Sequence, residues 1–203
     1  MTALPDIPRL YTALAECLAV LLFTPALAPR FSKAVTGGIT LLWVAGLSAF
    51  LALTGNVPGG LWIPCMAAAI GFSYLYLWGV WSITLLEAGY HCARAFILAE
   101  FAASVEWQLH CALWPARSAW GPLSLLLLAL VYGALFGGMC YWLHISPQPA
   151  GHLEIGGNAA LTAVTLALTA FAVSNLGFLP GSDINMSIFS IRTLVDFSGV
   201  LIL

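Results

Sequence analysis

Charged side chains are scarce in this sequence. Its 203 residues include 6 Lys and Arg and 8 Asp and Glu, so only 7% are charged, while 62% are hydrophobic. A soluble domain carries about 25% charged residues. The composition excludes an ordinary soluble domain and predicts an all-α, polytopic integral membrane helix bundle with the lipid bilayer as its surroundings. The net charge of −2 leaves no basic patch, so we expect no nucleic-acid partner.

Catalytic and metal-binding motifs are also missing. The four histidines form no HExxH and no pair at i, i+4, the five cysteines form no CxxC, and no GxSxG or GxGxxG occurs. We therefore expect no metal, no cofactor and no catalytic residue. The cysteines are expected to be reduced and buried as small hydrophobic residues.

Long apolar runs divide the chain into about seven helices, of which six to seven are expected to cross the membrane. Residues 1–203 are predicted to form a single domain. The runs are 9–28, 34–54, 61–86, 94–114, 119–143, 159–178 and 188–203. Twenty residues of helix cover about 30 Å, the thickness of the hydrocarbon core. The last run is short and stops while still apolar, so we expect a truncated or interrupted protein. Residues 87–92 are predicted to be a short polar link.

Two glutamates lie inside the fourth run, and a membrane-embedded charge marks a candidate functional site. Helical spacing places two mixed stripes and one apolar stripe on this helix. The first stripe is Glu100, Ser104, Trp107 and Cys111. The second stripe is Ala99, Ala103, Glu106 and His110. The apolar stripe, expected to face lipid, is Leu98, Phe101, Val105 and Leu109.

The two mixed stripes are expected to face neighbouring helices. Small residues on the second stripe let a partner helix approach, so that Glu106 and His110 could hydrogen-bond across the gap. The polar groups then form either a structural clamp or the lining of a signal or substrate pocket, and the sequence leaves both interpretations open.

Arg192 and Asp196 are spaced i, i+4 in the last run and therefore share a helix face. They are either a self-neutralising pair or a polar joint in the helix that leaves the membrane. Arg192 could instead pair with Glu16, Glu100 or Glu106 on another helix, and the sequence does not choose among them.

Three segments resemble the N-terminal membrane region of Firmicute sensor histidine kinases of the GHKL-ATPase type. They are IPRLYTALAECLA at 7–19, RAFILAEFAASVEWQL at 94–109 and IRTLVDFSGVLIL at 191–203. The resemblance implies a signal-sensing input domain that passes a signal through its last helix to a cytoplasmic kinase. It also implies a homodimer and an unidentified small-molecule or peptide signal. This sequence carries no phosphoacceptor helix and no ATP-binding motif, so we expect no enzymatic activity from it.

The candidate sensing or polar-core residues all lie in these three segments or next to them. They are Glu16, Arg94, Glu100, Ser104, Glu106, Trp107, His110, Arg192 and Asp196. An alternative function is a small-molecule transporter or its substrate-binding membrane subunit, and a further class is an intramembrane enzyme. No inverted repeat or broken helix pair supports the transporter, and no catalytic spacing supports the enzyme.

The orientation follows from the basic residues of the connections. Arg30, Lys33 and Arg94 fall on one side of the seven-helix arrangement, whereas Arg9 and Arg117 fall on the other. The side with more Lys and Arg is expected to be cytoplasmic. This predicts a multi-pass protein of the bacterial plasma membrane with its N-terminus outside and its C-terminus in the cytoplasm.

Overall fold

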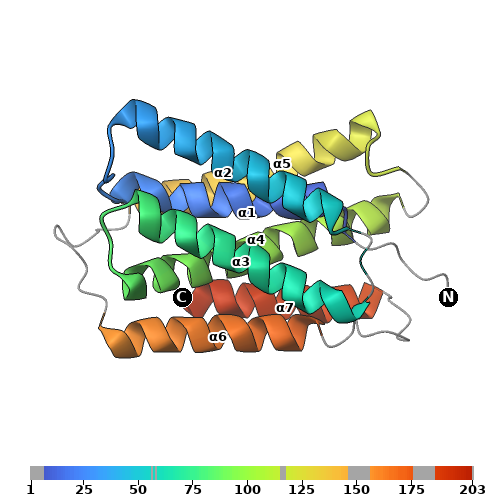
Figure 1. Cartoon of the computed structure of the whole chain (residues 1–203). Coiled ribbons are helices and arrows are strands. Elements are labelled where there is room, and N and C mark those ends of the chain that lie inside the picture. The colour runs from blue at the N-terminus through green and yellow to red at the C-terminus, as the bar shows by residue number, and fades with distance from the viewer. Residues whose placement is uncertain are drawn as a thin grey trace.

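The computed structural model describes residues 7–55, 57, 59–114, 118–145, 156–175 and 186–202, which fold into seven α-helices and contain no strand. The helices are α1 Arg9–Phe23, α2 Lys33–Leu53, α3 Gly59–Val80, α4 Leu85–Leu113, α5 Pro122–Ile145, α6 Gly157–Asn175 and α7 Met186–Ile202, with a 3-10 turn, η1, at Thr24–Ala26 after α1 (Figure 1). The predicted all-α bundle of about seven helices is confirmed.

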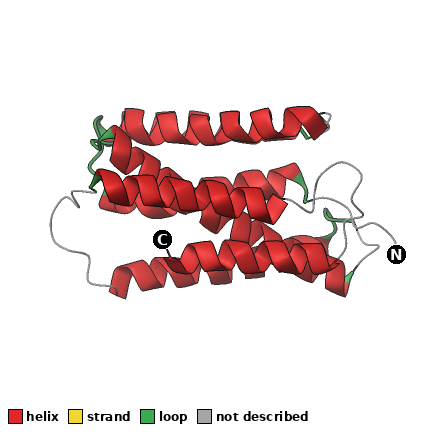
Figure 2. Ribbon diagram, turned by 90° about the horizontal axis from the view of Figure 1, so that it is seen from below, coloured by secondary structure: helices red, strands yellow, loops and turns green. Residues whose placement is uncertain are grey.

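Helix α4 is the centre of the bundle. It packs against α1, α3, α5, α6 and α7, whereas α2 packs only on α1 and α3 among the helix pairs in substantial contact. Successive helices run in opposite directions, and their axes lie roughly along one common direction in both views (Figures 1 and 2). The helix that carries the two central glutamates is therefore enclosed by other helices.

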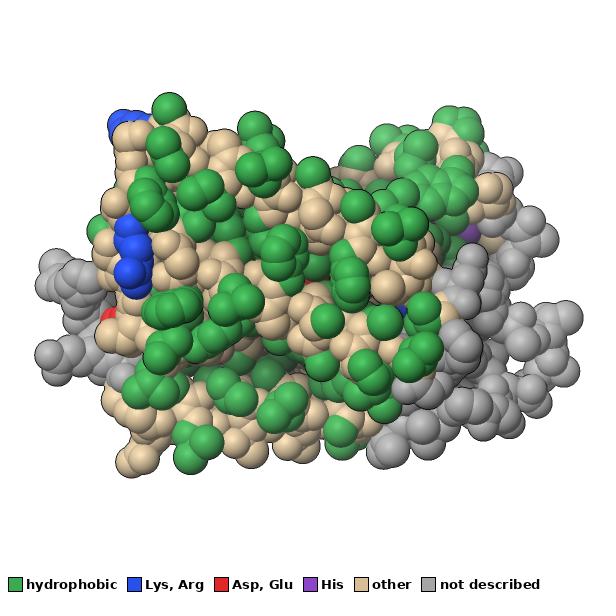
Figure 3. Space-filling model, viewed as in Figure 1, with side chains coloured by type: hydrophobic (Ala, Val, Ile, Leu, Met, Phe, Trp, Pro, Cys, Tyr) green, Lys and Arg blue, Asp and Glu red, His purple; other side chains and the backbone are tan. Residues whose placement is uncertain are grey.

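The long apolar helices other than α1 lie mainly at the outside of the bundle. Four helices are long and apolar enough to cross a membrane, over Arg9–Ala26, Lys33–Leu53, Ile63–Val80 and Pro122–Ile145, and α6 contains a shorter apolar stretch. Their outward side chains include Leu41, Leu42 and Leu53, which are 72%, 74% and 84% exposed. Hydrophobic side chains cover the face in Figure 3, and Lys and Arg gather at one end of it. Such a surface is compatible with a lipid environment, because lipid and not water satisfies exposed apolar groups.

The boundary between α3 and α4 differs from the prediction. α3 ends at Val80 and α4 begins at Leu85, so the predicted polar link 87–92 is wrong and lies inside α4. The cause is a capping box: the Thr84 side chain accepts a hydrogen bond from the Glu87 amide (3.2 Å), and the Glu87 carboxylate accepts one from the Thr84 amide (2.6 Å). This reciprocal pair satisfies two of the amides that a helix start leaves open.

The remaining boundaries shift by a few residues. α1 ends at Phe23, before the proline-containing 3-10 turn, rather than at residue 28. α5 continues through His144 and Ile145, both of which the sequence analysis predicts to lie in the next loop. Arg117 and most of the loops predicted at 144–158 and 179–187 lie outside the described residues.

Candidate functional site

A buried polar cluster joins α4 to α7. Arg192 on α7 donates a hydrogen bond to the carboxylate of Glu100 on α4 and forms an ion pair with it. The Arg192 Nε atom lies 3.9 Å from Asp196 Oδ2, and Ser104 Oγ donates to the same Asp196 oxygen at 3.4 Å. All four side chains are buried. Of the three partners that the sequence left open for Arg192, the structure pairs it with Glu100, and it also retains the neighbouring Asp196.

Gln108 extends this cluster by one more helical turn. Its side-chain amide donates to Ser190 Oγ at 2.7 Å, and its carbonyl oxygen accepts from Thr193 Oγ1 at 3.0 Å. Sequence analysis missed Gln108 because it lies outside the two stripes drawn there. The sequence does contain a signal for Gln108, however. Polar residues stand at every fourth position, Glu100, Ser104 and Gln108, and so share one helix face. We call these three residues, with Ser190, Arg192, Thr193 and Asp196, the α4–α7 polar cluster.

Because the α4–α7 polar cluster is buried, breaking its ion pairs is costly. A charge in an apolar interior costs several kcal/mol unless it is paired, and removing one member of a buried pair typically costs about 3–5 kcal/mol. Two carboxylates here face one guanidinium, and a serine hydroxyl donates to the second carboxylate. The cluster therefore fixes the register of α7 on α4 more strictly than apolar packing alone would.

Close apolar packing supports the same interface. A Cβ atom added at Gly199 of α7 would lie 2.9 Å from Ile97 Cγ2 of α4 and 3.8 Å from Ala170 Cβ of α6. Ile97 is itself buried, and its branched side chain has little rotamer freedom. The absence of a side chain at Gly199 thus allows α7 to approach α4 closely, toward the end of the helix.

Glu106 lies on the face of α4 that is turned to α1 and α5. It is fully buried, and neither carboxylate oxygen has a hydrogen-bond partner within the described part of the chain. Tyr11 and Tyr132 are close enough to interact with it electrostatically. Their hydroxyls donate instead to backbone carbonyls, Tyr11 to Ala119 and Tyr132 to Tyr11 at 3.0 Å. Glu106 therefore does not form the predicted hydrogen bond across a helix gap to any residue that the structure describes.

Aromatic rings surround this second face. Trp107 and His110 stack with ring centroids 4.7 Å apart and an interplanar angle of 6°, and Tyr11 meets Trp107 edge-on at 6.2 Å. Trp107 and His110 are both buried. These contacts place Trp107 and His110 in an aromatic layer between helices. Neither residue takes part in the hydrogen bonds described above for the α4–α7 polar cluster.

Two other predicted site residues lie elsewhere. Glu16 on α1 lines a small cavity between α1, α3 and α4. The Arg94 guanidinium stacks over the rings of Phe23, at 4.6 Å, and Tyr90, at 5.4 Å, so it forms cation–π contacts and no described contact with the polar cluster. Among the described residues, no group of three or more His, Cys, Asp or Glu side chains is placed to hold a metal ion.

The predicted lipid-facing stripe of α4 is only partly exposed. Leu98 is 3% exposed and belongs to the core, so its prediction is wrong. Phe101 packs against Phe197 of α7, with ring centroids 5.4 Å apart, and only Leu109 is exposed. The reason is that α4 is enclosed by helices on more sides than its two mixed stripes indicated.

The sequence and the structure were compared with known proteins. No family model matches the chain, and neither a curated protein nor a solved structure matches it.

Proposed function

We propose that this chain is the membrane-embedded signal-sensing domain of a two-component sensor histidine kinase. In this proposal a signal in the membrane region is passed through the last helix to a cytoplasmic kinase. The resemblance of the three sequence segments suggests the class of protein. The observation that carries the proposal is the α4–α7 polar cluster, which ties the last helix to the most enclosed helix of the bundle.

A mechanism follows from this arrangement. Helix α4 contacts five other helices, so a ligand that favours one position of any of them also biases α4. Because the contacts between α4 and α7 are buried and polar, they resist independent sliding of the two helices. A displacement of α4 is then transmitted to α7, and Glu100 and Arg192 are the residues that transmit it.

The proposed orientation is that of a multi-pass protein of the bacterial plasma membrane, with the C-terminus in the cytoplasm. Arg30 binds backbone carbonyls of Trp81 and Ile83, where α3 ends and α4 begins. α7 runs toward that same end of the bundle (Figure 1). A basic end on the side of the last helix supports a cytoplasmic C-terminus under the positive-inside rule. A homodimer and a small-molecule or peptide signal complete the proposal.

The experiment is a fusion of the whole chain, through Leu203, to a histidine-kinase catalytic domain, with autophosphorylation measured in membranes. We expect Glu100→Ala or Glu106→Ala to lock or abolish the response while the protein still inserts. Leu109→Ala, on the same helix but exposed, is the matched control and should behave like wild type. Wild-type output from both glutamate variants, at equal membrane levels, contradicts the assignment of these residues.

One observation favours a second candidate function, a small-molecule transporter or its substrate-binding subunit. A cavity of about 340 Å³ lies between α3, α4 and α6, with Gly71, Gly89 and Ala167 among its lining residues. This volume is within the range of small-molecule sites, about 300–1,000 Å³. Its apolar lining suits an uncharged, hydrophobic molecule. Uptake of radiolabelled candidate substrates into vesicles separates the two functions, because a sensor accumulates none of them.

A further inference from the structure

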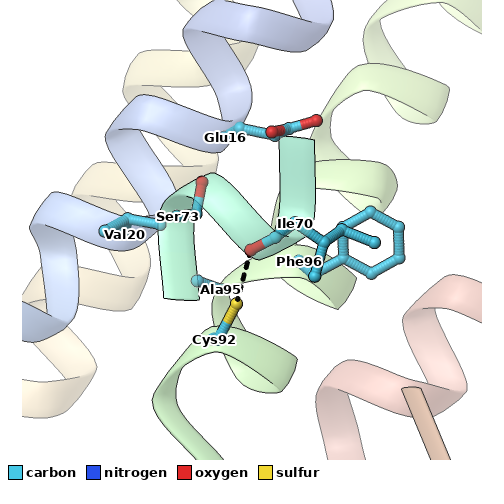
Figure 4. A pocket seen from close by; sticks show the side chains of 7 residues that line it. All are labelled: Glu16, Val20, Ile70, Ser73, Cys92, Ala95 and Phe96. Carbon is cyan, nitrogen blue, oxygen red and sulfur yellow. Dashed lines mark hydrogen bonds between the residues drawn. The ribbon is translucent and has the colours of Figure 1, made fainter. Parts of the chain in front are cut away.

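A second, smaller cavity lies between α1, α3 and α4, and it is lined by polar atoms as well as apolar ones (Figure 4). Glu16 of α1, Ser73 of α3 and Cys92 of α4 contribute to its wall. Its free volume is about 10 Å³, close to the least that admits one water molecule. The lining side chains of Glu16, Ser73 and Cys92 are at most 5% exposed, so whatever binds there is enclosed by the bundle.

Two buried polar atoms of this cavity have no partner within the described residues. They are Oε1 of Glu16 and Oγ of Ser73, from two different helices. In contrast, the Cys92 thiol donates to the Ile70 carbonyl at 3.6 Å. A buried hydroxyl or carboxyl oxygen without a hydrogen bond is destabilising, and each such group calls for an explanation.

The behaviour of Ser73 differs from that of other hydroxyl residues in these helices. A helical Ser or Thr commonly donates to the carbonyl four residues earlier. Thr40, Thr54, Thr169 and Ser198 do so here, each at 2.8 Å. Ser73 has no such bond although it is buried, and it lines the cavity. Its hydroxyl is therefore available to a ligand in the cavity.

We propose that this cavity is a binding site for one water molecule, which joins Glu16 of α1 to Ser73 of α3. Water fits the chemistry, because it donates to the Glu16 oxygen and accepts from the Ser73 hydroxyl, and it also fits the volume. A monovalent cation fits less well, since Glu16, Ser73 and the Ile70 carbonyl supply few oxygen ligands. A larger organic ligand does not fit the volume.

The water site connects polar groups on four helices. The carboxyl groups of Glu16 and of Glu100 on α4 act on each other as like charges, and Glu100 is paired with Arg192 of α7. Together with the bridge from Ser73, a series of polar interactions runs from α3 through α1 and α4 to α7. Any role of this series in signalling rests on the proposed function, whereas the water site itself does not.

The test uses the purified full chain in lipid nanodiscs. Infrared spectra of wild type minus variant, recorded in ordinary water and in water enriched in oxygen-18, cancel the bulk water and report O–H stretches of internal water that the variant has lost. We expect an isotope-sensitive band in the wild type that disappears in Ser73→Ala. Ser124→Ala is the matched control: Ser124 is also buried, but its hydroxyl donates to the Ser118 carbonyl at 2.9 Å, so the band should remain.

Thermal unfolding gives an independent readout. Ser73→Ala and Glu16→Ala should each lower the apparent Tm by about 2–6 °C. The decrease in Tm of the double variant should be clearly smaller than the sum of the two single decreases, because either substitution alone releases the water. An absent band in the wild type, a band unchanged in Ser73→Ala, or additive losses overturn the proposal. A wild-type Tm that rises on replacing choline by sodium at constant ionic strength overturns it in favour of a cation. None of these readouts depends on signalling, so the outcome is separable from that of the kinase fusion.

Discussion

Arg192 on the last helix forms a buried ion pair with Glu100 on the central helix, 92 residues earlier in the chain. Asp196, one turn further along α7, lies 3.9 Å from the same guanidinium and accepts a hydrogen bond from Ser104. This arrangement brings three charged groups together in the buried contact between α4 and α7. It makes the position of α7 depend on α4, which is the basis of the predictions below.

The two glutamates in the middle of α4 are predicted to contribute to stability with opposite signs. Glu100→Met leaves Arg192 without its main partner and should lower the free energy of unfolding by about 3 kcal/mol. Glu106→Met removes a buried carboxyl that has no described hydrogen bond and should raise it by about 1 kcal/mol. Unfolding of both variants by a denaturing detergent in mixed micelles measures the difference. Losses of equal size in the two variants would show that Glu106 has a stabilising partner after all.

The close approach of α7 to α4 at Gly199 predicts a specific cost of adding a methyl group. Gly199→Ala would meet Ile97 Cγ2 at 2.9 Å and should destabilise the protein by about 1–3 kcal/mol. The added Cβ would also lie 3.3 Å from Ile97 Cδ1. Ile97→Val in the same chain removes Cδ1 but keeps the closer Cγ2, whereas Ile97→Ala removes both, so Ile97→Ala should reduce the added cost of Gly199→Ala more than Ile97→Val does.

The control for this substitution is Gly133→Ala on α5, where, apart from the neighbouring backbone of α5 itself, no described atom lies within 4 Å of the added Cβ. It should leave the stability unchanged or raise it by up to about 1 kcal/mol, because alanine favours the helix. If Gly199→Ala and Gly133→Ala have the same effect, the two helices do not pack as closely as described.

The capping box predicts how the start of α4 responds to mutation. Thr84→Ala removes the side-chain acceptor of the Glu87 amide and should cost about 1 kcal/mol, while Thr84→Ser keeps the oxygen and should cost little. Hydrogen–deuterium exchange of the amides in the first turn of α4 should become faster in Thr84→Ala only. Equal exchange in all three proteins would mean that the cap does not hold this helix start.

Much of the fold was predictable because hydrophobic runs and their breaks determine helices in a chain of this composition. The face of α4 that carries Glu100 and Ser104 was also predictable from helical spacing, and both residues belong to one cluster in the structure. The start of α4 was missed although its signal, Thr84 followed three residues later by Glu87, is present in the sequence. Glu87 begins the predicted polar link 87–92, whereas in the structure it is part of a helix cap.

The partner choices were not predictable from the sequence. Arg192 had three candidate partners, and only the three-dimensional arrangement of α1, α4 and α7 selects Glu100. Arg94 is among the predicted polar-core residues as part of the resembling segment 94–109, but it packs on the aromatic rings of Phe23 and Tyr90. Helical spacing tells which residues share a face, and it does not tell which helix that face meets.

The most direct test of the central claim is a double-mutant cycle between Glu100 and Arg192, measured as the free energy of unfolding in mixed micelles. Glu100→Met and Arg192→Met should each cost about 3 kcal/mol, because each leaves a buried charge behind. The double variant should cost clearly less than their sum, with a coupling energy of about 2–3 kcal/mol, because both charges are then gone. Additive costs would show that the two residues do not interact, and would contradict the proposal that α4 holds and moves α7 through this pair.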